Sequence, residues 1–83
     1  MKNRVVIISN QFSSVPNSIK SICIHGEVQQ NKISLMTVSE VKGLEFDVAL
    51  VYDQGMLEAE KYIAYTRCLS ELYIIDSSEA AFV

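Results

Sequence analysis

The stretch DVALVYD, residues 47–53, has the clearest strand pattern in the chain. It is a continuous apolar run between two aspartates, and Gln54-Gly55 follows it as a turn. Continuous apolar runs of this length are typical of strands that are buried on both faces, as in a parallel sheet. A second run of this type, RVVIIS, occupies residues 4–9. The two runs predict the centre of a sheet inside an α/β domain.

Three shorter apolar segments are also predicted to be strands. They are residues 22–24, residues 33–38, and residues 72–75, the last as a buried strand. Strands that alternate with short helices are joined by crossover connections, which produce parallel pairing. We therefore predict a mostly parallel sheet of about four or five strands.

Helices are predicted between these strands. Pro16 and Asn17 are suited to open a short helix. Residues 57–69 contain no Gly or Pro, and apolar side chains recur there at helical spacing. The residues with this spacing are Tyr62, Tyr65, Leu69 and Leu72. The two tyrosines are expected in the core and not on a surface that stacks bases.

Length and composition predict one small domain, residues 1–83, with a thin core. Hydrophobic residues make up 49% of the chain, and a domain of this size buries roughly 60–65% of its unfolded surface. Seven Lys and Arg stand against ten Asp and Glu, so the net charge is −3. Because phosphate neutralisation supplies most of the energy of DNA binding, tight binding by the chain alone is not expected.

Other features exclude several classes of protein. No apolar run approaches the roughly 18 residues of a membrane span, and the amino-terminal run is too short for a signal peptide. A cytoplasmic location is therefore expected. Cys23 and Cys68 lack the spacing of a zinc site and are expected to be buried thiols, with a single disulfide between them as the open alternative. His25 has no potential ligand at a suitable spacing, so it is expected in a loop and no metal site is predicted.

Two segments resemble motifs of one family. MTVSEVKGLEFDVALV, residues 36–51, resembles motif V of UvrD/PcrA/Rep-like superfamily 1 DNA helicases, and KGLEFD matches without a gap. YIAYTRCLSELYII, residues 62–75, resembles motif VI, and its defining positions hold Tyr62, Ala64, Thr66 and Arg67. A weaker similarity covers residues 7–14, which resemble the strand and turn that open the second motor domain of this family.

The resemblance implies a partial RecA-like domain from the C-terminal motor of an ATP-dependent DNA helicase. In this family ATP lies between two RecA-like domains, of which the first supplies the phosphate loop and the second supplies motifs V and VI. By resemblance, Arg67 is the arginine finger, whose fixed and always-charged fork suits phosphoryl transfer. Gly43 and Glu45 are implied to lie at the nucleotide, with Glu45 accepting a hydrogen bond from a ribose hydroxyl.

The resemblance also implies contacts with single-stranded DNA. Thr37, Ser39 and Lys42 would form the DNA-facing set, although Ser39 replaces a histidine of the family. Two further departures are Cys68, where the family has a small Ala, and a shorter connection between the two motifs.

The chain contains no G-x-x-x-x-G-K-[ST] loop. Without that loop nothing cradles the β- and γ-phosphates, so the chain alone is not expected to hydrolyse ATP. ATP and Mg²⁺ would require a partner, an N-terminal RecA-like domain with the Walker A loop.

Simpler interpretations stay open for each residue. Arg67 and Glu71 are four residues apart and could form a surface ion pair on a helix. Glu45 and Lys42 could be solvated, and Thr37 could reflect strand propensity alone. At the level of function, the alternatives are a degenerate interaction module that binds proteins or forms a homo-oligomer, and a non-catalytic binder of single-stranded DNA.

Overall fold

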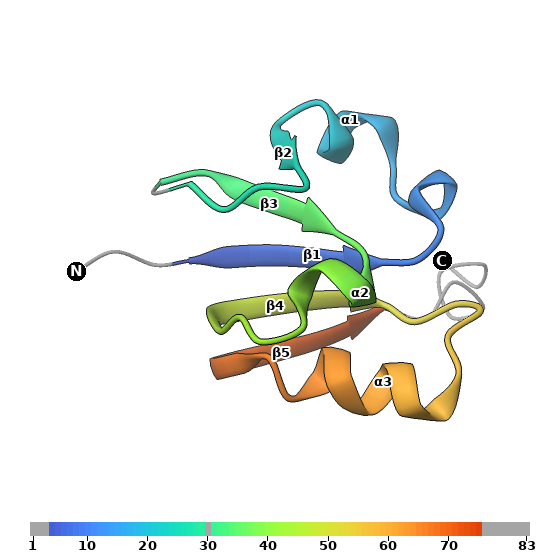
Figure 1. The fold of residues 1–83 in the computed structure, drawn as a ribbon. Helices are drawn as coiled ribbons and strands as arrows, with labels where there is room; N and C mark the ends of the chain where they lie inside the picture. Colours follow the sequence, from blue (N-terminus) through green and yellow to red (C-terminus); the bar gives the residue numbers. More distant parts are fainter. Residues whose placement is uncertain (1–3, 30, 76–83) are drawn as a thin grey trace.

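The chain folds into one parallel sheet with short helices on both faces (Figure 1). The computed structural model describes residues 4–29 and 31–75. Five strands lie in the order β2-β3-β1-β4-β5, and every neighbouring pair is parallel. The strands are β1 (Val5–Ser9), β2 (Cys23–His25), β3 (Ile33–Met36), β4 (Phe46–Tyr52) and β5 (Cys68–Ile75). The predicted α/β class and parallel sheet are confirmed.

The helices are short and follow the crossover pattern. A 3₁₀ turn, η1 (Phe12–Ser14), and α1 (Asn17–Lys20) connect β1 to β2. The connection from β3 to β4 contains α2 (Val38–Val41), and α3 (Glu58–Tyr65) connects β4 to β5. Helices of this length are not stable in isolation, so packing on the sheet must hold them. The short helix predicted to open near Pro16 is confirmed as α1.

Two clusters of side chains form the core, one on each face of the sheet. Side chains alternate along a strand, so Val6 and Ile8 of β1 pack with α2 and α3, whereas Ile7 packs on the opposite face. Val15, from the η1–α1 segment, covers Ile7 on that opposite face. Within the described residues, no helix has the length and apolar character that a membrane span requires.

The predicted helical stripe through residues 62–72 is wrong in its second half. The helix α3 ends at Tyr65, and Leu69 and Leu72 lie on β5. The Thr66 hydroxyl donates one hydrogen bond that is shared between the carbonyls of Tyr62 and Ile63, at the end of the helix. Pairing with β4 then directs the chain into a strand, so tertiary contacts override the local spacing.

Burial at this side of the sheet also differs from the prediction. Tyr62 is 70% exposed, so it is not a core residue. The predicted buried strand is instead an edge strand, on which Tyr73 and Ile74 are about half exposed.

The predicted strand at residues 33–38 ends at Met36 because a helix begins there. Thr37 is the N-cap of α2: its Oγ1 accepts from the Glu40 N–H at 3.3 Å, and its own N–H donates to Glu40 Oε1 at 2.8 Å. This reciprocal arrangement is a capping box, which has the sequence signature Thr-x-x-Glu. The signature is present in the chain and could have predicted α2.

Candidate functional site

Arg67 lies at the amino ends of the strands, where β4 and β5 begin. Its carbonyl accepts a hydrogen bond from the N–H of Phe46, the first residue of β4, at 2.8 Å. Its Nη1 donates to the Leu44 carbonyl at 3.4 Å. Leu44 stands between Gly43 and Glu45, so the two segments that resemble helicase motifs lie side by side here.

The guanidinium of Arg67 is half-buried and held by three acceptors. Besides the contact to Leu44, Nε donates to the Ile63 carbonyl and Nη2 donates to Thr66 Oγ1, both at 3.2 Å. A guanidinium carries five N–H donors, so these contacts orient the group without using its full capacity. This geometry suits a cation that is positioned to bind an oxyanion.

The ion pair between Arg67 and Glu71 on a helix is not found, and that interpretation is wrong. Glu71 lies on β5, opposite Val48 of β4. In the described part of the chain, the ion pair that forms joins Lys61 Nζ to Glu58 Oε2 at 3.5 Å.

The turn beside Arg67 is open to solvent. Gly43 has a φ of +80°, a left-handed conformation that favours glycine, and apart from its two chain neighbours no residue has an atom within 4 Å of the position that a Cβ would occupy. Lys42 and Glu45 on either side are exposed. The structure thus brings Arg67, Gly43 and Glu45 to one edge and leaves space next to the turn.

A second arginine, Arg4, lies at the same edge, and the sequence analysis did not single it out. Its guanidinium carbon is 5.2 Å from the centre of the Phe46 ring, a cation–π distance. Its backbone N–H donates to Asp47 Oδ2 at 2.7 Å. The buried Phe46 therefore contacts both arginines, Arg4 through its ring and Arg67 through its backbone. Only knowledge that β1 pairs with β4 could have predicted this arrangement.

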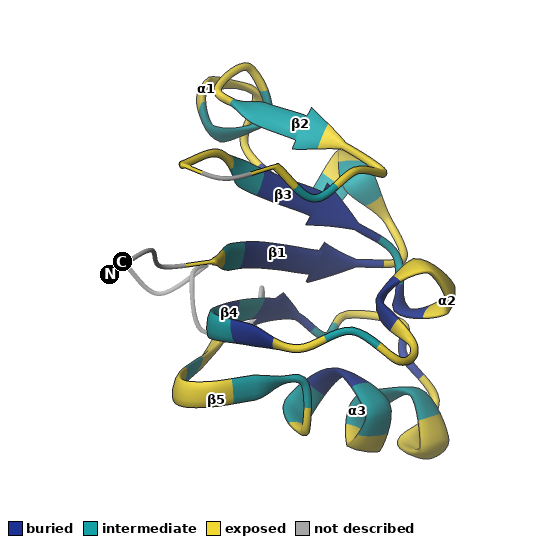
Figure 2. Ribbon diagram, turned by 60° about the vertical axis from the view of Figure 1, so that its left-hand side comes forward, coloured by how far each residue is buried: buried dark blue, intermediate teal, exposed yellow. Residues whose placement is uncertain are grey.

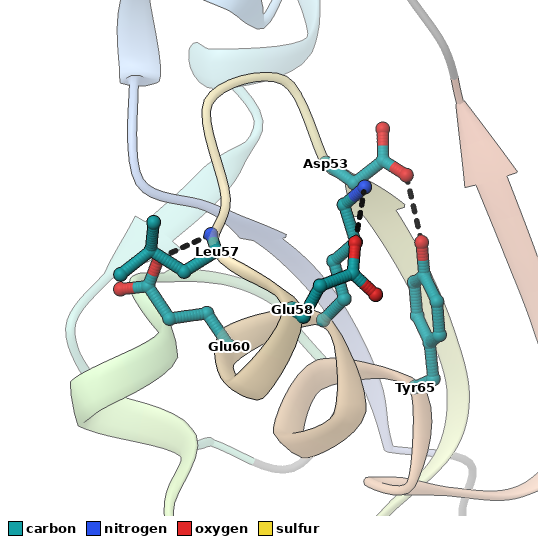
Figure 3. A network of polar contacts seen from close by, with 6 residues as sticks. Asp53, Leu57, Glu58, Glu60 and Tyr65 are labelled. Carbon is teal, nitrogen blue, oxygen red and sulfur yellow. Dashed lines mark hydrogen bonds and ion pairs between the residues drawn. The ribbon is translucent and has the colours of Figure 1, made fainter.

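The carboxyl ends of the strands lie on the opposite side of the sheet from Arg67. Ligands commonly bind at these ends in open α/β sheets. Here Asn10 connects the starts of two helices: its Oδ1 accepts from the Val38 N–H at 3.1 Å, and its Nδ2 donates to Glu60 Oε2 at 3.0 Å. Glu60 Oε1 also accepts from the Leu57 N–H at 2.9 Å (Figure 3). Side-chain oxygens of Asn10 and Glu60 therefore occupy N–H groups at the helix starts that would otherwise attract an anion.

Other contacts at these ends are equally internal. Ser9 is buried and forms a local turn in which its Oγ donates to the Gln11 carbonyl at 2.8 Å. The Tyr65 hydroxyl donates to Asp53 Oδ2 at 2.7 Å, which ties α3 to the residue after β4 (Figure 3).

The predicted DNA-facing residues all lie on or beside the short helix α2. Thr37 lies at the ends of the strands and its hydroxyl interacts with Glu40, whereas Lys42 stands at the far end of α2. Ser39 is exposed on α2 between them.

The two cysteines are free thiols and both are half-buried. Burial raises the pKa of the Cys23 thiol, whose Sγ donates to the Ile19 carbonyl at 3.2 Å. Burial also raises the pKa of Tyr52, and the charge of a Cys23 thiolate would raise it further. A thiol with a raised pKa is a poor nucleophile at neutral pH. Both groups lie in the cluster on the α1 face of the sheet.

Within residues 4–29 and 31–75, no three His, Cys, Asp or Glu side chains are placed to hold a metal ion. The same residues enclose no pocket of ligand size.

The fold and the site define a small α/β protein with an all-parallel sheet and an arginine presented at the amino ends of its strands. Comparison with protein-family models, with curated proteins and with solved structures finds no match to this chain.

Proposed function

We propose that this chain is the C-terminal motor-domain half of a UvrD-like, ATP-dependent DNA helicase and that it contributes an arginine finger to a shared ATP site. The single observation that supports this proposal is the contact between Arg67 Nη1 and the Leu44 carbonyl at 3.4 Å. It joins the two motif-like segments through residues that are 23 positions apart in the chain. A finger and a nucleotide-binding turn must lie together if they are to serve one nucleotide.

The residues at this edge fit half of a nucleotide site. Arg67 offers a planar cation that backbone carbonyls orient, and the turn at Gly43 leaves open space beside it. In this proposal the Arg67 fork binds the oxygens of the transferred phosphoryl group, and Glu45 accepts a hydrogen bond from a ribose hydroxyl. ATP with Mg²⁺ supplies the phosphoryl group, and the phosphate loop that cradles it belongs to the partner domain. Arginine fingers accelerate such reactions by about 10³–10⁵.

The contribution to DNA binding is proposed to be small. Ser39 and Lys42 are exposed and could contact a phosphate backbone within a full assembly, whereas the Thr37 hydroxyl is already engaged by Glu40. The chain has a net charge of −3. We therefore expect the chain alone to bind oligonucleotides no better than non-specific binders, with Kd values of about 10⁻⁴–10⁻⁶ M.

The test is reconstitution of ATP hydrolysis. The chain is combined with the first motor domain of a UvrD-like helicase, which carries the phosphate loop but lacks its own second domain. Each component alone should be inactive, and the mixture should hydrolyse ATP. Arg67→Ala should lower the rate of the mixture by about 10³-fold or more. Lys20→Ala, on the α1 side of the sheet, is the matched control and should leave the rate unchanged.

Two results would overturn the proposal. One is ATP hydrolysis by the isolated chain that Arg67→Ala abolishes, because a complete site would then reside in these residues. The other is a reconstituted activity that does not respond to Arg67→Ala.

A further inference from the structure

The outer edge of β5 has the properties of an interface. The strand is eight residues long and, among the described strands, pairs only with β4. Its other edge presents backbone groups that a further strand can pair with. Three large apolar side chains are exposed along it: Leu69 at 64%, Tyr73 at 51% and Ile74 at 46%. Figure 2 shows the contrast between this largely exposed strand and the buried β1.

Proteins normally protect such an edge. Common protections are very short edge strands, charged side chains (especially Lys), Pro, or a covering helix. The edge at β2 is protected by its length, since β2 has three residues. The sequence of β5, CLSELYII, has no Pro or Lys and one charged residue, Glu71. The two edge strands of the sheet therefore differ: β2 is short, whereas β5 is long and lacks the residues that prevent pairing with a further strand.

We propose that β5 pairs with β5 of a second copy of this chain, antiparallel and across a two-fold axis at Tyr73, to form a continuous sheet through a dimer. A closed two-fold dimer uses the same patch on both copies, so the patch must be complementary to itself. This inference rests on the geometry of β5 and does not depend on the proposed ATP site.

The side chains of β5 fit that register. Leu72 and Ile74 lie opposite Ala49 and Val51, and therefore on the α2–α3 face, while Glu71, Tyr73 and Ile75 lie on the other face. With the axis at Tyr73, the two Tyr73 side chains meet and Leu72 of each copy meets Ile74 of the other. Cross-strand aromatic and apolar pairs of this kind stabilise a sheet.

The same register also separates the charges. Glu71 of one copy lies opposite Ile75 of the other, so the two Glu71 residues are four positions apart along the strands. That offset is about 13 Å at about 3.3 Å per residue, longer than the screening length of about 8 Å at physiological salt. An axis at Glu71 would instead place the two carboxylates directly opposite each other, which is unfavourable.

The first test measures mass in solution. Light scattering of the purified chain should give twice the chain mass of 9.3 kDa. Tyr73→Lys introduces the charge that protects natural edges, so the mass should fall by half. Tyr62→Lys is the matched control, because Tyr62 is 70% exposed but lies on α3, and it should remain dimeric. Far-UV circular dichroism verifies that both variants are folded.

A cross-link tests the register itself. In a background with Cys23→Ser and Cys68→Ser, a Tyr73→Cys variant should form an intermolecular disulfide under mild oxidation. Opposed Cα atoms of antiparallel strands are about 4.5–5.5 Å apart, within the span of a disulfide. Tyr62→Cys in the same background should not cross-link. The proposal is overturned if the wild-type chain stays monomeric up to its solubility limit. It is also overturned if Tyr62→Lys dissociates the dimer while Tyr73→Lys does not, or if Tyr62→Cys cross-links in preference to Tyr73→Cys.

Discussion

The two ends of the sheet differ in how their polar groups are used. At the carboxyl ends of the strands, Asn10, Thr37 and Glu60 form hydrogen bonds with one another or with helix N–H groups. The polar groups there are therefore paired within the chain. At the amino ends, Arg67 and Arg4 both contact the buried Phe46, Arg67 through its backbone and Arg4 through its guanidinium. In open α/β sheets, ligands usually bind at the carboxyl ends of the strands. In this chain Arg67, at the amino ends, donates three side-chain hydrogen bonds from a group with five N–H donors, so the hydrogen-bond pattern favours the proposed site there.

The largest effect should come from removing the apolar support of the amino end. Phe46 is fully buried, contacts the guanidinium of Arg4 and begins β4. Replacing a buried Phe with Ala typically costs about 3–5 kcal/mol. Because a small domain has a stability of about 5–15 kcal/mol, Phe46→Ala should remove a large fraction of it and shift the midpoint of a urea titration at 25 °C to a much lower concentration.

Two variants keep this prediction testable. Phe46→Leu retains most of the apolar volume and should stay folded with a smaller loss. Phe12→Ala is the matched control at the carboxyl end, where the phenylalanine is only partly buried against the second core cluster. If Phe12→Ala destabilises the chain as much as Phe46→Ala, the amino end is not the better-anchored region.

A smaller effect is expected at Gly43, where the backbone and not packing sets the result. The φ of +80° disfavours an L side chain, but apart from the two chain neighbours no residue lies within 4 Å of a Cβ there. Gly43→Ala should therefore lower the free energy of unfolding by about 1–2 kcal/mol. Gly43→Asn should cost less, because Asn tolerates this region, as Asn31 does at a φ of 66°. Equal losses for Ala and Asn would argue against a purely conformational cost.

At the carboxyl end, Asn10→Ala tests whether the polar contacts contribute to stability. The substitution removes the acceptor of the Val38 N–H and the donor to Glu60 Oε2, while Glu60 Oε1 keeps its bond to Leu57. We expect a loss of about 1 kcal/mol. Asn10→Asp retains the acceptor for Val38 but places a carboxylate beside Glu60, so it should be less stable at pH 7 than at pH 4. Asn17→Ala on α1 is the control and should change stability little; a loss as large as that of Asn10→Ala would show that the contacts do not matter.

The sequence predicted the sheet well because continuous apolar runs identify buried strands without reference to other segments. It failed where long-range pairing decides the outcome. Apolar residues have helical spacing at Tyr62, Tyr65, Leu69 and Leu72. The second half of that stretch nevertheless pairs with β4 and forms the strand β5. Exposure of Tyr73 follows from the position of β5 at the end of the strand order, which no local pattern specifies.

The candidate site was predictable in part for the same reason. Motif-like residues identified Arg67, Gly43 and Glu45, and the proximity of Arg67 to the Gly43–Glu45 turn requires that β4 and β5 start together. Arg4 reaches this edge only through the pairing of β1 with β4. The capping box of Thr37 and Glu40 was visible in the sequence, and it gives the Thr37 hydroxyl a structural role that strand propensity did not indicate.

Replacing Arg67 should have the smallest effect on stability. A small loss of stability together with a large loss of ATP hydrolysis would distinguish a binding residue from a structural one. Its three side-chain contacts are 3.2–3.4 Å long and the group is half-buried, so Arg67→Ala should cost about 1 kcal/mol or less in urea titrations. The same substitution should lower reconstituted ATP hydrolysis by about 10³-fold, equivalent to about 4 kcal/mol of transition-state stabilisation. Arg67→Lys should preserve stability but lose most of that rate, because an ammonium cannot replace the planar fork. If Arg67→Ala unfolds the chain, the guanidinium serves mainly to join α3 to the Leu44 turn. The polar groups at the amino end of the sheet would then be used for contacts within the chain, as they are at the carboxyl end.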